Sequence, residues 1–383
     1  MNITPDRYDA IVVGVGGMGS ATVYRLAERG LDVLGIERFD VPHTHGSSHG
    51  STRIVRLTQP EDPSYVPLAR AAYDNWAELE RQTGRTLITR TGSIHASAPE
   101  AELFTDARQS VETHGIEHEI LTGATVNERF PGYDLPSEYR AVYQPDGGFV
   151  DCEQAVIAHV EAAHEAGATV RARERVLDWR ETRNGVRLKT DKGVYEADDV
   201  VFTTGAWTGD ILPEIAHELT PVRRIMAWFQ PKKPDWFQPE TLPVFSLAGE
   251  RGNGYGFPVH DVPGFKFGRE PALPNAVDPD EMPPEPTAAE EELHREFADA
   301  YFPDGGGPTL RLRTCVYTAS TDGHFVLGSH PNRDGVHVAA GFTGHGFKFT
   351  AVIGDVLADF VVNGTTDHTV ELHRIERLLN ANE

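Results

Sequence analysis

The chain has 383 residues, enough for two domains. Its formal net charge of −23 argues against a basic surface, so we expect neither nucleic acid nor an anionic membrane as a partner. Apolar runs are too short for a membrane span, no signal-peptide pattern opens the sequence, and two cysteines cannot build a disulfide framework, which together favour a cytoplasmic protein.

Residues 8–37 have the pattern of a βαβ unit. An apolar run at 10–13 predicts a buried parallel strand. The glycines of a G-x-G-x-x-G fingerprint follow: Gly14, Gly16 and Gly19. A helix capped near residue 30 and a strand ending at Glu37 complete the unit. We expect the glycines to admit a pyrophosphate at the helix N-terminus and the acidic residue to bind ribose hydroxyls. The fingerprint does not distinguish FAD from NAD.

The middle of the chain is predicted to contribute further strands and a helix to the same domain. Residues 153–166 have helical spacing, and 168–180 are typical of one strand. Residues 185–207 predict a hairpin with its turn at 191–193, followed by a buried strand and a small-residue turn. We expect Val176 and Gly205 from these segments to contact the cofactor.

The last third brings further elements. The proline-rich, acidic segment 271–286 predicts a surface loop, and 288–302 predict a helix. Residues 335–361 have the pattern of a strand, a glycine-rich turn and a helix. Nucleotide-binding elements therefore occur at the start, middle and end of the chain, which predicts a discontinuous cofactor domain interleaved with a substrate domain.

Five segments, in order, carry a family resemblance: "GSSHGSTRIVR" (46–56), "YGFP" (255–258), "KFGRE" (266–270), "CVYT" (315–318) and "AAGFTGHGFKF" (339–349). The chain resembles, nearly end to end, the monomeric sarcosine oxidases and their relatives, the flavin-dependent N-methyl amino acid oxidases. The resemblance implies an α/β fold whose Rossmann-like FAD-binding domain comprises residues 1–90, 149–220 and 321–383. An α+β substrate domain with a mainly antiparallel sheet would comprise 91–148 and 221–320.

Cys315 would ordinarily be interpreted as a small buried hydrophobic residue. The resemblance instead implies that it carries FAD covalently, through an 8α-S-cysteinyl thioether. If residues 311–317 form a strand, then Arg311, Arg313, Cys315 and Tyr317 share one face, and we expect a neighbouring guanidinium to favour the thiolate. Cys152 is expected to be a core residue.

The resemblance also implies roles for other matching positions. The implied catalytic residues are Lys266 near flavin N5, Tyr317, Arg53 and His49; a cation at position 266 would stabilise superoxide. The implied substrate-binding residues are Arg56 and Lys348 for a carboxylate, Tyr255 and Glu270. The implied cofactor contacts near the C-terminus are Gly344, Gly346 and Lys348. By residue type alone, the arginines and Lys266 would be surface residues and the tyrosines packing residues.

Glu270 departs from the sarcosine oxidase pattern, which has histidine there. The spacing from Lys266 to Glu270 resembles that of fructosyl amino acid oxidases. We expect Glu270 to face a distant polar group of the substrate or to pair with a nearby arginine, because a carboxylate at the reacting nitrogen would keep the amine charged.

The expected function is FAD-dependent oxidation of secondary amines, above all N-methyl amino acids, with oxygen as the electron acceptor. The expected products are hydrogen peroxide and an imine, which hydrolyses to an aldehyde and an amine. The alternatives are a fructosyl amino acid oxidase, an NAD-dependent dehydrogenase and a non-catalytic flavoprotein subunit.

The expected partners are a small-molecule amine and oxygen, with no metal, and the chain is expected to be a monomer or a weak homo-oligomer. Only six of the 35 basic residues are lysine. The acidic surface favours a protein from a salt-loaded cytoplasm; the alternative is an ordinary cell with an arginine-rich codon bias.

Overall fold

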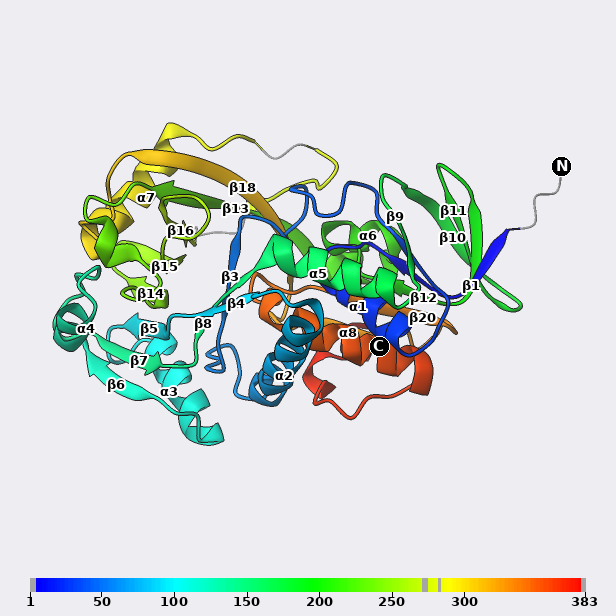
Figure 1. Ribbon diagram of the computed structural model, residues 1–383, viewed down its shortest axis with the longest axis horizontal. Helices are drawn as coiled ribbons and strands as arrows, with labels where there is room; N and C mark the ends of the chain where they lie inside the picture. Colours follow the sequence, from blue (N-terminus) through cyan, green and yellow to red (C-terminus); the bar gives the residue numbers. More distant parts are fainter. Residues whose placement is uncertain (1–4, 271–274, 282–283, 380–383) are drawn as a thin grey trace.

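The computed structural model describes residues 5–270, 275–281 and 284–379 and contains two large sheets and a small third one (Figure 1). The first large sheet has the order β10-β11-β12-β1-β2-β9, with β20 beside β12 and β19 beside β20. Its strands are β1 (Asp6–Val13), β2 (Val33–Ile36), β9 (Thr169–Arg171), β10 (Val176–Thr182), β11 (Gly185–Thr190), β12 (Val194–Phe202), β19 (Val326–Ser329) and β20 (Val336–Ala340). Five of them run parallel, so their carboxyl ends share one edge, where open parallel sheets bind ligands.

Helices cover one face of this sheet. They are α1 (Gly17–Glu28), α2 (Tyr65–Thr83), α5 (Cys152–Glu165) and α8 (Thr350–Asn363). Ala10 and Val12 of β1 belong to the core shared with these helices, whereas Ile11 and Val13 belong to a separate cluster. Because side chains alternate along a strand, both faces of β1 are buried, which explains its continuous apolar run.

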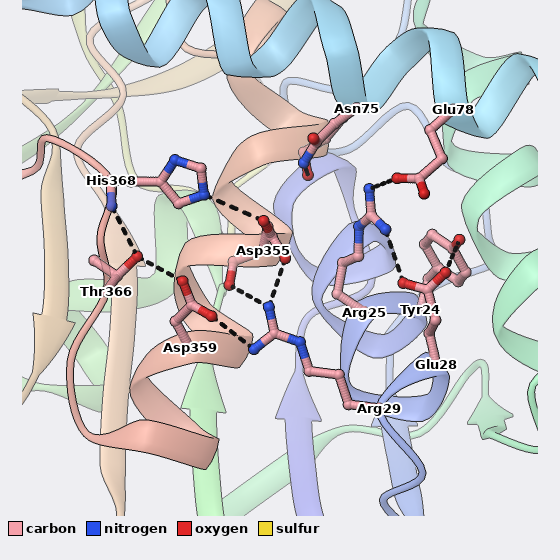
Figure 2. Close-up of polar contacts among 11 residues, drawn as sticks. Tyr24, Arg25, Glu28, Arg29, Asn75, Glu78, Asp355, Asp359, Thr366 and His368 are labelled. Atoms are coloured by element: carbon pink, nitrogen blue, oxygen red, sulfur yellow. Dashed lines mark hydrogen bonds and ion pairs between the residues drawn. The ribbon is translucent and has the colours of Figure 1, made fainter.

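Ion pairs tie three of these helices together (Figure 2). Arg29 of α1 lies 2.5 Å from Asp355 and 2.9 Å from Asp359, both on α8. Arg25 of α1 lies 2.6 Å from Glu78 of α2. These pairs hold α1 in place, and the N-terminus of α1 faces the dinucleotide groove.

The second large sheet has the order β17-β13-β16-β15-β14-β5-β7-β6, with β18 paired to β13. Its strands are β5 (Ser93–Ser97), β6 (Glu119–Thr122), β7 (Arg140–Gln144), β13 (Leu219–Phe229), β14 (Val244–Gly249), β15 (Gly252–Phe257), β16 (Phe265–Arg269), β17 (Asn275–Ala276) and β18 (Thr309–Ser320). All its pairings are antiparallel except that of β5 with β14. The associated helices are α3 (Glu102–His114), α4 (Gly123–Arg129) and α7 (Ala288–Tyr301), the last opened by a capping box of Thr287 and Glu290.

The small third sheet consists of β3 (Thr52–Val55), β8 (Gly148–Asp151) and β4 (Ile88–Arg90). The remaining short elements are α6 (Thr208–Ile211), α9 (Glu376–Leu379) and the 3₁₀ turns Gly205–Trp207, Pro213–Glu218, Pro234–Phe237, Phe347–Phe349 and Glu371–His373. In Figure 1, the long strands β13 and β18 run from the second sheet toward the first.

The predicted α/β class, the βαβ unit and the strand–turn–helix near the C-terminus are confirmed. Two element predictions were wrong. Residues 168–180 form two strands, β9 and β10, because the chain takes a left-handed conformation at Arg173 (φ 58°). In the segment predicted as a loop, β17 pairs with β13; residues 271–274 and 282–283 of that segment lie outside the described residues.

The strands of the first large sheet come from residues 6–36, 169–202 and 326–340, and those of the second from 93–144, 219–276 and 309–320. This distribution supports the discontinuous division into two domains, whose boundaries we keep as a proposal. Within the described parts of the chain, no helix has both the length and the apolar character needed to cross a bilayer.

Candidate functional site

A cavity of about 730 Å³ lies between the two large sheets. One end is formed by the carboxyl ends of β1, β2 and β12, the other by the second sheet and the glycine-rich turn after β20. Most predicted site residues lie on its wall: Gly14, Gly16, Glu37, Arg53, Arg56, Val176, Gly205, Tyr255, Glu270, Cys315, Tyr317, Gly344, Gly346 and Lys348. The structure thus brings together residues that are far apart in the sequence. The two outermost residues of this set, Gly14 and Lys348, are 334 positions apart.

The fingerprint glycines are required by close backbone contacts. Gly14 has φ +91°, and a Cβ there would lie 2.6 Å from the Thr203 carbonyl oxygen. A Cβ on Gly19 would lie 1.8 Å from the Gly14 carbonyl oxygen. At Gly16 the nearest atom to such a Cβ is Ser48 Oγ at 3.6 Å, so this backbone is open to the cavity. These contacts fit the roles of tight turn, close helix packing and pyrophosphate approach.

Glu37 lies on the wall of the groove, and its carboxylate is already engaged. It accepts hydrogen bonds from Val15 N at 2.9 Å and Phe39 N at 3.0 Å, and His43 Nε2 lies 3.5 Å away. Burial would raise its pKa, but His43 and the two backbone donors outweigh that effect and lower the pKa. Glu37 is therefore ionised and fixed where a ribose would lie in a βαβ nucleotide site.

One face of the second sheet forms the opposite wall. Arg224 of β13 pairs with Cys315 of β18, and Tyr317 lies two residues further along the same face. On the adjoining strands, Ser246 of β14 pairs with Tyr255 of β15, and Tyr255 pairs on its other side with Gly268 of β16. Cross-strand partners share a face, so the register alone places the predicted anchor, the tyrosines and Arg224 together.

Cys315 is buried and contacts Arg53, with Nη2 3.7 Å from its sulfur. Burial raises the pKa of the thiol, and the charges of Arg53, Lys266 and Arg224 oppose that rise. Arg311 and Arg313 are exposed instead. The neighbouring guanidiniums that favour the thiolate are those of Arg53 from β3 and Arg224 from β13, together with the ammonium of Lys266 from β16, and not those of Arg311 and Arg313 on the same strand.

Cys152 is buried, as expected of a core residue, but its surroundings are not simply apolar. Its Sγ lies 2.9 Å from Glu153 Oε2, and the charges of Arg53 and Lys266 act on it. Burial dominates and raises the pKa of the thiol. Glu153 in turn accepts hydrogen bonds from the backbone N–H groups of Gly50 and Ser51, so the thiol contacts the carboxylate that holds the residues just before β3.

Arg56 and Lys348, the predicted carboxylate-binding pair, are both buried on the cavity wall. Lys348 Nζ donates to the His345 carbonyl oxygen at 2.7 Å. Arg56 Nη2 lies 2.6 Å from Glu61 Oε1, so a side-chain carboxylate occupies this guanidinium. Burial and then Arg56 lower the pKa of Lys348 to about 7, with Glu61 opposing. The sequence analysis missed Glu61; its signal was only an acidic residue in a proline-flanked turn.

Lys266 and His49 lie behind the wall rather than on it, within the described residues. Lys266 Nζ donates to Gly50 O and Thr52 O, both at 2.7 Å, and to Thr52 Oγ1 at 2.9 Å. Burial lowers its pKa, as does Arg53. Burial also lowers the pKa of His49 to about 3, so its imidazole is neutral. Lys266 thus supports the backbone at Gly50 and Thr52 in this conformation.

Comparison with known proteins places this site in a family. The model of the family described as "FAD dependent oxidoreductase" (DAO) matches residues 9–360. The chain belongs to this family. It is 37% identical over 383 residues to monomeric sarcosine oxidase of Streptomyces avermitilis, covering 98% of each chain, and 36% identical over 376 residues to that of Bacillus sp. strain NS-129, covering 97% of each.

Among solved structures, the chain is similar to NikD, described as an unusual amino acid oxidase essential for nikkomycin biosynthesis. The TM-score is 0.84 at 26% identity, covering 98% of this chain and 97% of that one. The cofactor of the family is thus FAD, and the glycine contacts and the engaged Glu37 fit its dinucleotide part. In the described ranges, no group of three or more histidine, cysteine or acidic side chains is placed to hold a metal ion.

Proposed function

We propose that this protein is an FAD-dependent oxidase of secondary amines that acts on N-methyl amino acids and passes electrons to oxygen. When bound, FAD supplies the redox chemistry: hydride transfer from the carbon beside the amine nitrogen, and reoxidation by oxygen, which gives hydrogen peroxide. The resulting imine hydrolyses in water to an aldehyde and an amine. The observation that carries the proposal is that one cavity contains both a dinucleotide groove and two buried cations, Arg56 and Lys348.

The chain's own residues would bind and orient the substrate. Arg56 and Lys348 would hold its carboxylate, which requires Arg56 to exchange Glu61 for the substrate. Tyr255 and Tyr317 from the sheet would line the reacting end. Lys266 would promote the reaction of the reduced cofactor with oxygen through its positive charge, acting from behind the loop that it holds.

The covalent linkage is part of the proposal. Cys315 would carry FAD as an 8α-S-cysteinyl thioether, supported by its place on the cavity wall and by Arg53 at its sulfur. The guanidinium would stabilise the thiolate, the nucleophilic form.

A second candidate substrate class is the fructosyl amino acids. The supporting observation is Glu270, which lies on the cavity wall where it can meet a polar extension of the substrate. The backbone N–H of Glu270 donates to Asn253 O at 2.8 Å, which anchors the residue after β16. The charge of Glu270 raises the pKa of Tyr255 and Tyr317 as a lesser cause after burial, so the carboxylate lies near both tyrosines.

We further propose a cytoplasmic location, a monomer or weak homo-oligomer, and adaptation to high salt. The net charge of −23 supports the adaptation to high salt.

The test is a panel of sarcosine, N-methyl amino acids, a fructosyl amino acid and the corresponding primary amines, with hydrogen peroxide as the readout. N-methyl amino acids should bleach the flavin anaerobically and release peroxide in air. Flavin bleaching without peroxide would indicate a dehydrogenase or a subunit that needs a partner. No bleaching by any secondary amine would overturn the proposal.

A further inference from the structure

Arg224 is a cation on the cavity wall whose hydrogen-bonding capacity is not met. Its Nη1 atom is buried without a partner, and within the described residues its side chain forms neither a hydrogen bond nor an ion pair. The guanidinium carbon lies 5.1 Å from the centre of the Tyr317 ring. A buried donor left unpaired is costly, so such a group in a cavity indicates a ligand.

The neighbouring cations of the cavity are engaged, which sets Arg224 apart. Arg53 donates to Ser47 O at 2.7 Å, Arg56 is paired with Glu61, and Lys348 donates to a backbone carbonyl. Arg224 projects from β13 beside Cys315, whereas Arg56 follows β3 and Lys348 lies in the glycine-rich turn after β20. The cavity therefore has a cation that belongs to a separate element from the Arg56 and Lys348 pair.

The cofactor, attached at Cys315 as proposed, would not offer the missing acceptor at this place. Arg224 is the cross-strand partner of Cys315, which would hold the dimethylbenzene ring of the flavin. The edge of that ring carries only carbon and hydrogen and accepts no hydrogen bond. Glu270, whose charge acts on both tyrosines, forms no ion pair with Arg224 in the described structure. With no acceptor among the described residues, the substrate or water can supply one.

We propose that Arg224 binds a second carboxylate of the substrate, so that the preferred amines are N-substituted dicarboxylic amino acids. Arg56 and Lys348 take the α-carboxylate, and Arg224 takes the carboxylate at the far end of the side chain. A guanidinium recognises a carboxylate through paired donors, and its position over Tyr317 limits its orientations. This inference rests on the proposed function and adds the substrate class to it.

The test compares N-methyl-L-glutamate with N-methyl-L-glutamine, which differ in charge and hardly in size. We expect kcat/KM to be at least about tenfold higher for N-methyl-L-glutamate, and Arg224→Gln to lower this ratio about tenfold or more. Arg224→Lys, which keeps the charge, should retain part of the preference. Arg311→Gln is the matched control, because Arg311 is an exposed arginine on the adjacent strand β18, and it should leave the ratio unchanged.

A second readout is independent of turnover. Glutarate and its monoamide, glutaramate, are titrated into the holoenzyme and followed by the flavin absorbance difference spectrum. Glutarate should bind more tightly to the wild type, and Arg224→Gln should remove the difference. Equal affinities in the wild type, or a preference that survives Arg224→Gln, would overturn the inference.

The two proposals fail in different ways. If sarcosine is oxidised but N-methyl-L-glutamate has no advantage over N-methyl-L-glutamine, only the second carboxylate site is wrong. If no secondary amine is oxidised, the proposed function is wrong, and the glutarate titration still decides whether Arg224 binds a carboxylate.

Discussion

Arg53 reaches Cys315 across 262 positions of sequence, and its Nη2 lies 3.7 Å from the cysteine sulfur. This contact joins the 46–56 loop of the cofactor side to β18 of the second sheet. It places one permanent positive charge at the thiol proposed to carry the flavin.

The thioether gives the first prediction. After acid precipitation the yellow colour should remain in the protein pellet of the wild type, because a covalent bond survives unfolding. Cys315→Ala should release its flavin into the supernatant. Cys152→Ala is the matched control, since it removes the other buried thiol, and it should keep the colour in the pellet. Wild-type colour in the supernatant would disprove the linkage.

Lys266 gives the second prediction. Lys266→Met should be reduced by substrate under anaerobic conditions at close to the wild-type rate, yet reoxidise at least about a hundredfold more slowly, since the charge that stabilises superoxide is lost. Stopped-flow absorbance measures the two half-reactions separately. Lys189→Met, at an exposed lysine, is the control. An equal loss in both half-reactions would mean that Lys266 acts only by holding Gly50 and Thr52.

Lys348 gives a prediction about pH. Its pKa is lowered to about 7 by burial and by Arg56, so the side chain is positively charged below pH 7 and loses this charge as the pH rises above 7. The dissociation constant of a simple carboxylate such as propionate should therefore be constant below pH 7 and rise up to tenfold per pH unit above it. Lys348→Arg stays charged and should flatten the profile between pH 6 and 9. A wild-type profile that is already flat would contradict this role.

The local elements of the site could be predicted from the sequence, because their signals are local. The turn at Gly14 and Gly16 is encoded by residues that lie next to one another in the chain. The cations at Cys315 could not be predicted, because Arg53 comes from β3, which is distant in the sequence, and Arg224 is placed by the register of β13 on β18. Lys266 was placed at the flavin by resemblance, but its burial behind the loop depends on how β16 packs against residues 50–52.

Salt gives the last prediction. The chain carries 58 acidic and 35 basic residues, so unscreened repulsion opposes the compact state. Raising KCl from low concentration to 1 M shortens the Debye length to about 3 Å, and the melting temperature should rise by several degrees. The same titration with sucrose in place of salt controls for exclusion of cosolvent from the surface. Equal melting temperatures at low and molar KCl would rule out the adaptation to high salt.

The pairing of β13 with β18 limits how this protein can change in evolution or by engineering. Arg224, Cys315 and Tyr317 depend on a single register that runs from Leu219 opposite Ser320 to Trp228 opposite Arg311. One inserted or deleted residue in either strand would turn the side chains beyond it to the opposite face. The proposed flavin attachment at Cys315 and the proposed substrate selectivity of Arg224 would then be lost together. New substrate preferences are therefore accessible through point substitutions on these strands, and through insertions or deletions only in the loops outside them.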